Sequence, residues 1–300
     1  MVRKPELLIP ASSLEVLKIA VMFGADAVYI GGEAFGLRAK AKNFSSDDMK
    51  EGIAFAHEHG VKVYVTANIL AHNGDLAGVR EYFQELREIK PDALIISDPG
   101  VFMIAKEVCP EIERHVSTQA NNTNYETYRF WYNLGAKRVV SARELSLEEI
   151  REIRAHIPDD MEIETFIHGA MCISYSGRCT LSNNMTNRDA NRGGCAQSCR
   201  WKYRLYKGDE KLNDDQELFS MSSKDLMAAR YIPDLIHAGV ASLKIEGRMK
   251  STYYIATVVK AYRMLIDEVY EKGEISEARM AFFLSELSKA ENRPADVGFY

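Results

Sequence analysis

The run "FGADAVYIGG" (residues 23–32) contains the pattern on which the fold of this chain depends. A helical segment ends at a glycine, and a short run rich in β-branched and aromatic residues begins a few positions later. The same arrangement, with glycine or proline at the helix end, recurs at residues 59–68, 89–98, 134–143 and 238–247. Repeated units of this kind indicate an α/β fold, in which parallel strands alternate with helices.

Three further β-rich runs raise the number of predicted strands to eight, at residues 6–12, 113–119 and 161–169. Eight strands that alternate with helices predict a closed (β/α)8 barrel of the TIM type. A doubly wound open sheet is the alternative, but the chain lacks the glycine-rich turn of the dinucleotide-binding folds. We therefore expect an α/β protein built on a TIM-like barrel.

The chain divides into a barrel and an insertion. We assign residues 1–169 and 236–272 to the barrel, and residues 170–235 to a cysteine-rich insertion between the seventh and eighth strands. The second half of the insertion alternates and turns at residues 207–210, which predicts a β-hairpin. We expect residues 273–300 to form a C-terminal helix and the start of a truncated extension.

The composition is typical of a soluble globular protein, since 46% of the 300 residues are hydrophobic and 27% are charged. No apolar run approaches the roughly 20 residues that span a bilayer, and the first residues lack a signal-peptide pattern. We therefore expect a cytoplasmic protein without a membrane partner, in which clustered cysteines more often bind metal than form disulfides. The net charge of −5 gives no overall attraction to nucleic acid, which would need a local basic patch.

Alternation along the strands places several charged side chains inside the barrel. In the seventh and eighth strands the aliphatic residues share one face, and Glu164, Lys244 and Glu246 share the other. Buried charges are costly unless they are paired. These three residues are therefore interpreted either as an ionic network that stabilises the interior or as functional groups.

Four polar residues stand at strand ends, where we expect them to face the mouth of the barrel: Asn68, Gln119, His168 and Arg248. Active sites of TIM barrels lie at the carboxyl ends of the strands. These positions favour contacts with a ligand. A hydrogen-bonded structural role is the alternative for His168.

Four of the five cysteines lie close together, with the spacing Cys-x6-Cys-x15-Cys-x3-Cys, at Cys172, Cys179, Cys195 and Cys199. Four thiolates suit either tetrahedral zinc or an iron–sulfur cluster, and the spacing alone does not choose between them. A cysteine nucleophile with His168 as its base would leave three thiols unexplained. Gly193 and Gly194 would let backbone N–H groups approach such a cluster.

Residues 188–204 contain an excess of basic side chains, with Trp201 and Tyr203 interleaved. Basic residues with stacking aromatics suit a single strand of nucleic acid. The same composition is also ordinary for a solvated loop.

The run "ETFIHGAMCISYSGRCTLS" (164–182) resembles the signature of peptidase family U32. That signature has Glu-x-Phe, Gly-[Ser/Ala]-aliphatic-Cys, Gly-x-Cys, and a serine three positions on. The matching residues are Glu164, Phe166, Gly169, Ala170, Cys172, Gly177, Cys179 and Ser182, with Met171 at the aliphatic position. The runs "LLIPASSLEVLKIAVMFGADAVYIGG" and "LKIEGRMKSTYYIATVVKAYR" are also similar to the family, so the resemblance covers nearly the whole chain.

The resemblance implies an activity and a cofactor. The better understood members of the family are oxygen-independent hydroxylation proteins that hold a [4Fe-4S] cluster on four cysteines. The chain looks most like members that convert the wobble uridine of tRNA to 5-hydroxyuridine, with prephenate as the hydroxyl donor. It thereby implies tRNA and a small dicarboxylate as partners, and it leaves a homodimer or a heterodimer with another family member open.

The resemblance also suggests roles for single residues. Cys172 and Cys179 match the signature, and Cys195 and Cys199 supply the remaining pair of metal ligands. The other expected site residues are His168 and Glu246 as catalytic groups, and Arg38, Asn68, Gln119 and Arg248 as substrate-binding groups. Arg38 and Arg248 would grip the dicarboxylate, and His168 would carry a proton.

Two other functions remain as alternatives. One is a collagenase-like peptidase, although the chain has no Gly-x-Ser-x-Gly or His-Glu-x-x-His motif. The other is an RNA-binding factor stabilised by zinc. The longer tRNA-modifying members continue into a small C-terminal β domain, which we expect this chain to lack.

Overall fold

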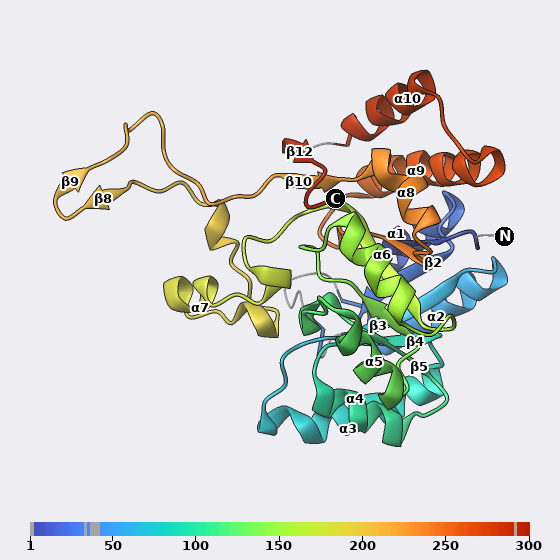
Figure 1. Cartoon of the computed structure of the whole chain (residues 1–300). Coiled ribbons are helices and arrows are strands. Elements are labelled where there is room, and N and C mark those ends of the chain that lie inside the picture. Colours follow the sequence, from blue (N-terminus) through green and yellow to red (C-terminus); the bar gives the residue numbers. More distant parts are fainter. Residues whose placement is uncertain (1–2, 33–34, 37–42, 291–292) are drawn as a thin grey trace.

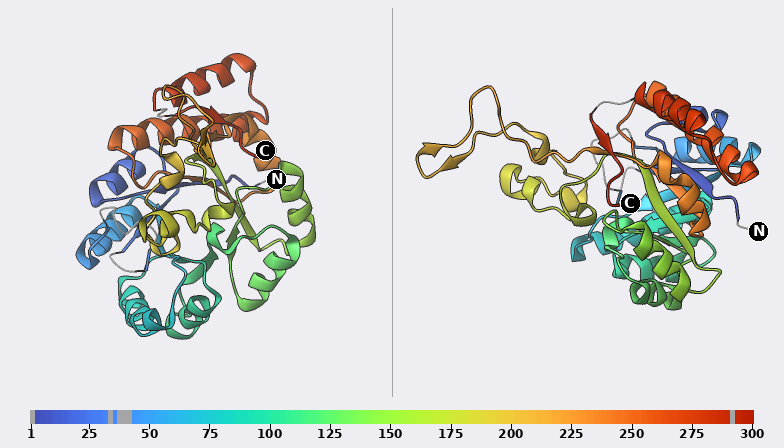
Figure 2. Two further views of the ribbon diagram at one scale, coloured as in Figure 1. Left: turned by 90° about the vertical axis from the view of Figure 1, so that its left-hand side faces the viewer. Right: turned by 45° about the horizontal axis from the view of Figure 1, so that its top comes forward.

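The computed structural model describes residues 3–32, 35–36, 43–290 and 293–300. Eight parallel strands close into a barrel, as the sequence predicts, with helices around it (Figures 1 and 2). Going round the barrel, β1 to β7 follow in chain order, and β11 closes the ring between β7 and β1. The barrel strands are β1 Glu6–Pro10, β2 Ala27–Gly31, β3 Lys62–Ala67, β4 Ala93–Ile96, β5 Glu113–Val116, β6 Arg138–Val140, β7 Glu162–Gly169 and β11 Ser242–Ile245.

The helices that surround the barrel begin and end where local chemistry favours it. Ser13, Ser45, Asn124 and Ser251 each accept a backbone N–H at a helix start, which satisfies a donor that the helix leaves unpaired. Gly135 ends one helix with φ = 96°, a value that costs glycine little. The helices are α1 Leu14–Met22, α2 Ser46–Glu58, α3 Leu76–Ile89, α4 Pro99–Val108, α5 Tyr125–Leu134, α6 Leu147–His156, α8 Ile232–His237 and α9 Thr252–Lys272.

Several elements lie outside the barrel. Strand β10 (Asp225–Met227) pairs antiparallel with β7, and β12 (Ala295–Asp296) pairs with β10, so these two strands extend the sheet beyond the closed ring. The helix α10 (Glu277–Ser288) packs against α9. Between β7 and β10 lie the helix α7 Leu181–Thr186 and the antiparallel hairpin of β8 Tyr206–Lys207 and β9 Glu210–Lys211. The hairpin turns at Gly208, within the turn that the sequence predicts, and projects far from the barrel (Figures 1 and 2).

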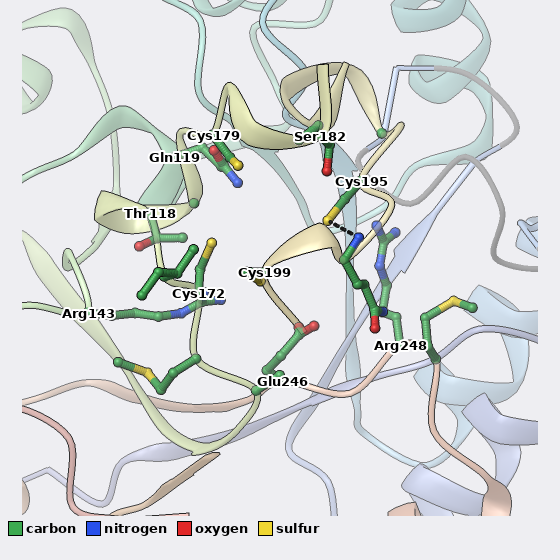
Figure 3. A pocket seen from close by; sticks show the side chains of 18 of the residues that line it. Thr118, Gln119, Arg143, Cys172, Cys179, Ser182, Cys195, Cys199, Glu246 and Arg248 are labelled. Carbon is green, nitrogen blue, oxygen red and sulfur yellow. Dashed lines mark hydrogen bonds between the residues drawn. The ribbon is translucent and has the colours of Figure 1, made fainter. Parts of the chain in front are cut away.

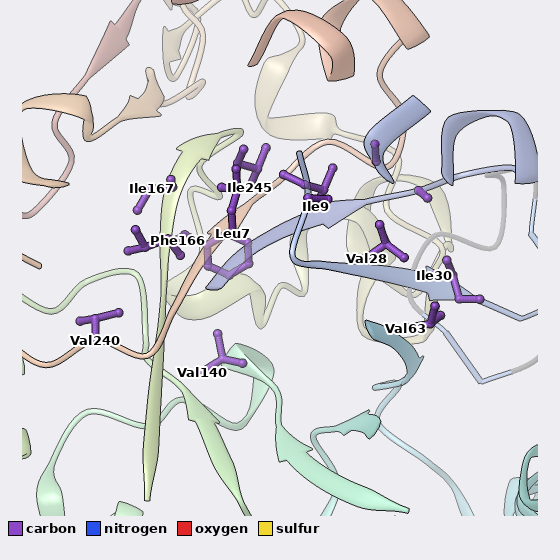
Figure 4. Close-up of a cluster of buried hydrophobic side chains, with 14 of the residues drawn as sticks. Leu7, Ile9, Val28, Ile30, Val63, Val140, Phe166, Ile167, Val240 and Ile245 are labelled. Atoms are coloured by element: carbon purple, nitrogen blue, oxygen red, sulfur yellow. The ribbon is translucent and has the colours of Figure 1, made fainter. Parts of the chain in front are cut away.

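The strands have two packing surfaces, as their alternation predicts. The outward side chains, such as Leu7, Val28 and Ile245, pack against the helices in one large apolar core (Figure 4). A smaller apolar cluster fills part of the barrel interior and consists of Leu8, Ala27, Tyr29, Tyr64, Ala93 and Ile95. Within the described part of the chain, none of the helices combines the length and the apolar composition that crossing a membrane requires.

The rest of the interior is occupied by a network of buried ion pairs. Arg138 donates to Glu6 at 2.7 Å, to Glu162 at 2.7 Å and to Glu164 at 3.0 Å. Lys244 extends the network, because its Nζ lies 2.7 Å from Glu164 Oε1. Of the three charged residues expected in the interior, Glu164 and Lys244 therefore pair with each other. The third, Glu246, instead accepts a hydrogen bond from the Tyr29 hydroxyl at 3.2 Å.

Replacing Arg138 with leucine should destabilise the protein strongly, because it removes the buried cation that three carboxylates share. We expect the free energy of unfolding, measured by urea denaturation, to fall by about 3–5 kcal/mol. The matched control is Arg80→Leu, which breaks an exposed ion pair with Glu107 and should barely move the urea midpoint. Similar losses in the two variants would contradict a structural role for the network.

Acid should weaken the same network. Burial acts to raise the pKa of Glu162, but the charge and hydrogen bonds of Arg138 outweigh it and lower this pKa from 4.5 to about 2. Glu162 therefore stabilises the fold fully above pH 4.5, and this contribution is lost as the pH falls towards 2. In Glu162→Gln we expect a shallower decline of unfolding free energy over that window, and an unchanged slope would refute the assignment.

Candidate functional site

A cavity of about 420 Å³ opens at the carboxyl ends of the barrel strands. Its floor is formed by one residue from each of five strands: Tyr29, Thr66, Ile95, Phe166 and Lys244. The apolar cluster and the ion pairs fill the barrel below this floor. The cavity therefore lies where TIM barrels place their active sites.

All four clustered cysteines line this cavity: Cys172, Cys179, Cys195 and Cys199 (Figure 3). They lie on the segment between β7 and the hairpin, which covers the mouth of the barrel. All are free thiols, so the disulfide interpretation does not hold for this structure. Burial, followed by the neighbouring Cys172, raises the pKa of the Cys199 thiol.

Asn191 fixes the position of Cys179. Its side chain accepts from Cys179 N at 3.1 Å and donates to Cys179 O at 3.0 Å, and its own carbonyl accepts from Leu70 N at 3.0 Å. The next residue, Arg192, forms a two-pronged ion pair with Asp75, in which the second contact measures 2.9 Å. The cysteine segment is thus tied to the loop that follows β3.

A second attachment holds the turn between Cys172 and Cys179. The Glu144 carboxylate accepts from both the backbone N–H and the hydroxyl of Ser176, each at 2.6 Å. Gly177 follows with φ = 82°, and a Cβ there would lie only 2.7 Å from Gln119 Nε2. Glycine is therefore favoured at this position by its backbone conformation, and its missing side chain leaves room for the amide of Gln119.

Gly194, one of the two glycines before Cys195, has a different role from the one expected. Gly194 N donates to Asp189 O at 2.7 Å, so this N–H group is occupied within its own turn. A Cβ on Gly194 would also lie 2.7 Å from Asp189 O, which explains why the position lacks a side chain. The N–H that approaches a cysteine sulfur belongs instead to Gln197, 3.4 Å from Cys195 Sγ.

The four cysteines surround the cavity without meeting at one point. Among the residues that the structure describes, no three histidine, cysteine or acidic side chains are arranged to hold a metal ion. A single tetrahedral zinc would need four sulfur atoms at about 2.3 Å from one centre. The thiols therefore provide four soft donors spread around one space.

Four other residues predicted for the site also line the cavity: Asn68, Gln119, Glu246 and Arg248. Arg248 is buried and donates to Thr66 Oγ1 at 3.3 Å. Its guanidinium passes over Gly31, where a Cβ would lie 2.2 Å from Nη1. Asn68 Nδ2 donates to Ser117 Oγ at 3.3 Å. Arg38 lies outside the described residues.

The position predicted for His168 is wrong. Its Nδ1 lies 3.3 Å from the Tyr262 hydroxyl on the outer helix α9, and the ring does not line the central cavity. The cause is a register shift in the pairing of β7 with β11, where Phe166 is opposite Lys244 but His168 is opposite Ile245. One extra residue in β7 thus turns His168 to the outer face, where burial lowers its pKa to about 3.

The structure adds a cationic residue that the sequence did not single out. Arg143 follows β6 and lines the cavity, with its Cζ 4.1 Å from the centre of the Phe166 ring. The sequence could have indicated this residue, because it lies at the end of a predicted strand and polar residues at that end of a barrel strand face the mouth. Several other cations share the lining, and in the described residues the complete set is Arg143, Arg188, Arg200, Lys244, Arg248, Lys250 and Arg293.

Comparison with known proteins adds close relatives. The chain is 48% identical over 303 residues to tRNA hydroxylation protein P1 of Bacillus subtilis. This alignment covers 99% of the chain and 71% of the relative. It is 40% identical over 310 residues to tRNA hydroxylation protein P of Escherichia coli, covering 88% of this chain and 68% of the relative.

A solved structure and a family model also match the chain. The solved structure of the U32 peptidase Mk0906 superposes with a TM-score of 0.54 at 13% identity, covering 81% of this chain and 93% of that one, which bears on the fold alone. The model of peptidase family U32 matches residues 12–300. The chain therefore belongs to peptidase family U32.

Proposed function

We propose that this chain is an RNA-modifying enzyme that hydroxylates the wobble uridine of tRNA to 5-hydroxyuridine. In this proposal a [4Fe-4S] cluster is the cofactor and prephenate is the hydroxyl donor. The observation that carries the proposal is the placement of four cysteines around one cavity at the mouth of the barrel. Relatives at 40–48% identity that are named tRNA hydroxylation proteins support tRNA as the substrate.

The donor set fits an iron–sulfur cluster. Cys172, Cys179, Cys195 and Cys199 would hold it, and four thiolates are its usual ligands. Their spread around the cavity suits a group with several atoms better than a single ion. When bound, such a cluster supplies one-electron redox chemistry. The N–H of Gln197, which already points at Cys195 Sγ, would tune its potential.

The charge of the cavity supports an anionic co-substrate. Seven basic residues line it, and in the described part of the chain Glu246 is the single acidic one. Guanidinium and ammonium groups bind carboxylates through charge-assisted hydrogen bonds. Prephenate carries two carboxylates, and the RNA backbone is itself anionic. Both expected partners are therefore anions, and their charge is opposite to that of the cavity lining.

The peptidase alternative lacks a base beside the cysteines. In the described residues no histidine lines the cavity, and His168, the candidate partner of a cysteine nucleophile, packs on the outer face of β7. A cysteine peptidase needs its histidine within hydrogen-bond reach of the thiol. The cavity is therefore a better match for hydroxylation than for cysteine-dependent proteolysis.

Cysteine replacement should distinguish the cluster from the alternatives. After anaerobic reconstitution we expect about four irons per chain and a brown absorption spectrum, both lost when Cys172 is replaced by serine. Cys109→Ser is the matched control, because Cys109 is buried at the end of α4, where its thiol donates to Ala105 O. A colourless protein that binds zinc instead would overturn the cluster.

Nucleoside analysis should test the reaction itself. When the gene is deleted in its own host, we expect 5-hydroxyuridine to disappear from the wobble position of tRNA, as measured by mass spectrometry. Re-expression of the protein should restore the nucleoside, and re-expression of Cys172→Ser should not. Unchanged 5-hydroxyuridine, in a host without a second copy of the gene, would refute the function. Cysteine-dependent cleavage of collagen or casein would favour the peptidase.

A further inference from the structure

Lys244 presents an unusual ammonium group on the floor of the cavity. The residue is only 4% exposed, yet it lines the cavity. Its Nζ donates a hydrogen bond to Glu164 and lies 4.5 Å from the centre of the Tyr29 ring and 5.4 Å from that of Phe166. An ammonium has three N–H donors, so two of them lack an oxygen acceptor among the described residues. A ligand in the cavity is placed to accept them.

The ion pair with Glu164 favours the charged form of Lys244. Burial lowers the pKa of Lys244, and the adjacent Glu164 opposes part of this shift. Below the floor three cations pair with three carboxylates, namely Arg3, Arg138 and Lys244 with Glu6, Glu162 and Glu164. A paired carboxylate 2.7 Å from Nζ favours the protonated ammonium. The Lys244 ammonium is therefore suited to bind an anion.

Arg143 presents a second cation beside the same aromatic ring. Its guanidinium stacks on Phe166, with Cζ 4.1 Å from the ring centre, and its side chain is among those that line the cavity (Figure 3). Its Nε is buried and has no hydrogen-bond partner in the described part of the chain. A guanidinium offers a planar fork of donors that matches one carboxylate.

Phe166 lies next to both cations. It is opposite Lys244 in the paired strands β7 and β11, and its carbonyl accepts from the Tyr300 hydroxyl at 2.6 Å. The ring offers an apolar surface next to the two positive groups. A ligand with two carboxylates beside a ring-shaped carbon skeleton would match these groups.

We propose that Lys244 and Arg143 are the recognition residues for the small dicarboxylate, each binding one carboxylate next to Phe166. This rests on the proposed function, which supplies the dicarboxylate class. The cavity of about 420 Å³ is large enough for such a ligand. Recognition by Lys244 and Arg143 would make affinity depend on the presence of both carboxylates.

Calorimetric titration of the purified protein tests this, with prephenate as the dicarboxylate and phenylpyruvate as its monocarboxylate counterpart. We expect the wild type to bind prephenate more tightly by about 10-fold or more, since a charge-assisted hydrogen bond contributes that much. Arg143→Gln and Lys244→Gln should each weaken prephenate binding by about 10-fold or more and largely remove its advantage over phenylpyruvate. Arg143→Lys should retain part of the advantage.

Controls separate binding from folding. Arg80→Gln and Lys106→Gln remove exposed cations far from the cavity and should bind both acids as the wild type does. Lys244→Gln removes one of the two cations that pair with Glu164, so the double variant Lys244→Gln/Glu164→Gln, which removes one charge of each sign, provides a second test. Arg143→Gln leaves the ion pairs untouched, and it keeps the test valid if both Lys244 variants fail to fold.

The outcomes distinguish this inference from the proposed function. Variants that keep the full preference for prephenate would overturn the recognition pair. A wild type that forms 5-hydroxyuridine in tRNA but does not bind prephenate would also overturn it, while the hydroxylation would stand. The purified protein could bind prephenate in the expected pattern while deletion of the gene leaves the tRNA of its host unchanged. That combination would support the recognition pair and refute the hydroxylation.

Discussion

The ion pair between Glu164 and Lys244 joins the structural and the functional halves of this barrel. Below it, Glu164 is bound by Arg138, whose guanidinium also reaches strands β1 and β7 through Glu6 and Glu162. Above it, the Lys244 ammonium forms part of the cavity floor. A buried charge is tolerated only with its partner in place. The arrangement at the floor thus depends on the closure of the ring, because Glu164 and Lys244 come from the two strands that complete it.

The cysteine segment is held in a different way from the barrel strands. Hydrogen bonds to loops fix its position, and its cysteines do not lie on strands. Glu144 holds the turn at Ser176, and Asn191 holds Cys179 against the loop after β3. These contacts come from loops that follow three different strands of the barrel, β3, β6 and β7. The positions of the thiols therefore depend on the arrangement of several loops at the mouth of the barrel. The proposed cluster would link loops that are distant in sequence.

Much of this could be predicted from the sequence because strand alternation is a local property. Tyr64 and Thr66 turn inward, and Val63 and Val65 turn outward, as the pattern of polar and aliphatic residues in β3 predicts. The eight strands were also identifiable, since all are short β-rich runs and five of them follow a helix end marked by glycine or proline. Arg138 was missed because an arginine within a short strand looks like a surface residue until its three carboxylate partners, one from β1 and two from β7, are brought together.

His168 shows where local reasoning fails. Its orientation depends on how β7 pairs with β11, and the extra residue in β7 appears only in that pairing. The same bulge keeps the imidazole out of the cavity, because Phe166, which precedes it, lies inside and His168, which follows it, lies outside. Without the extra residue, His168 would turn inward as Phe166 does and add a titratable ring to the cavity wall, while strand order and the surrounding helices stayed the same. A barrel of this kind can acquire new chemistry by relocating a bulge, without a change in its catalytic loops.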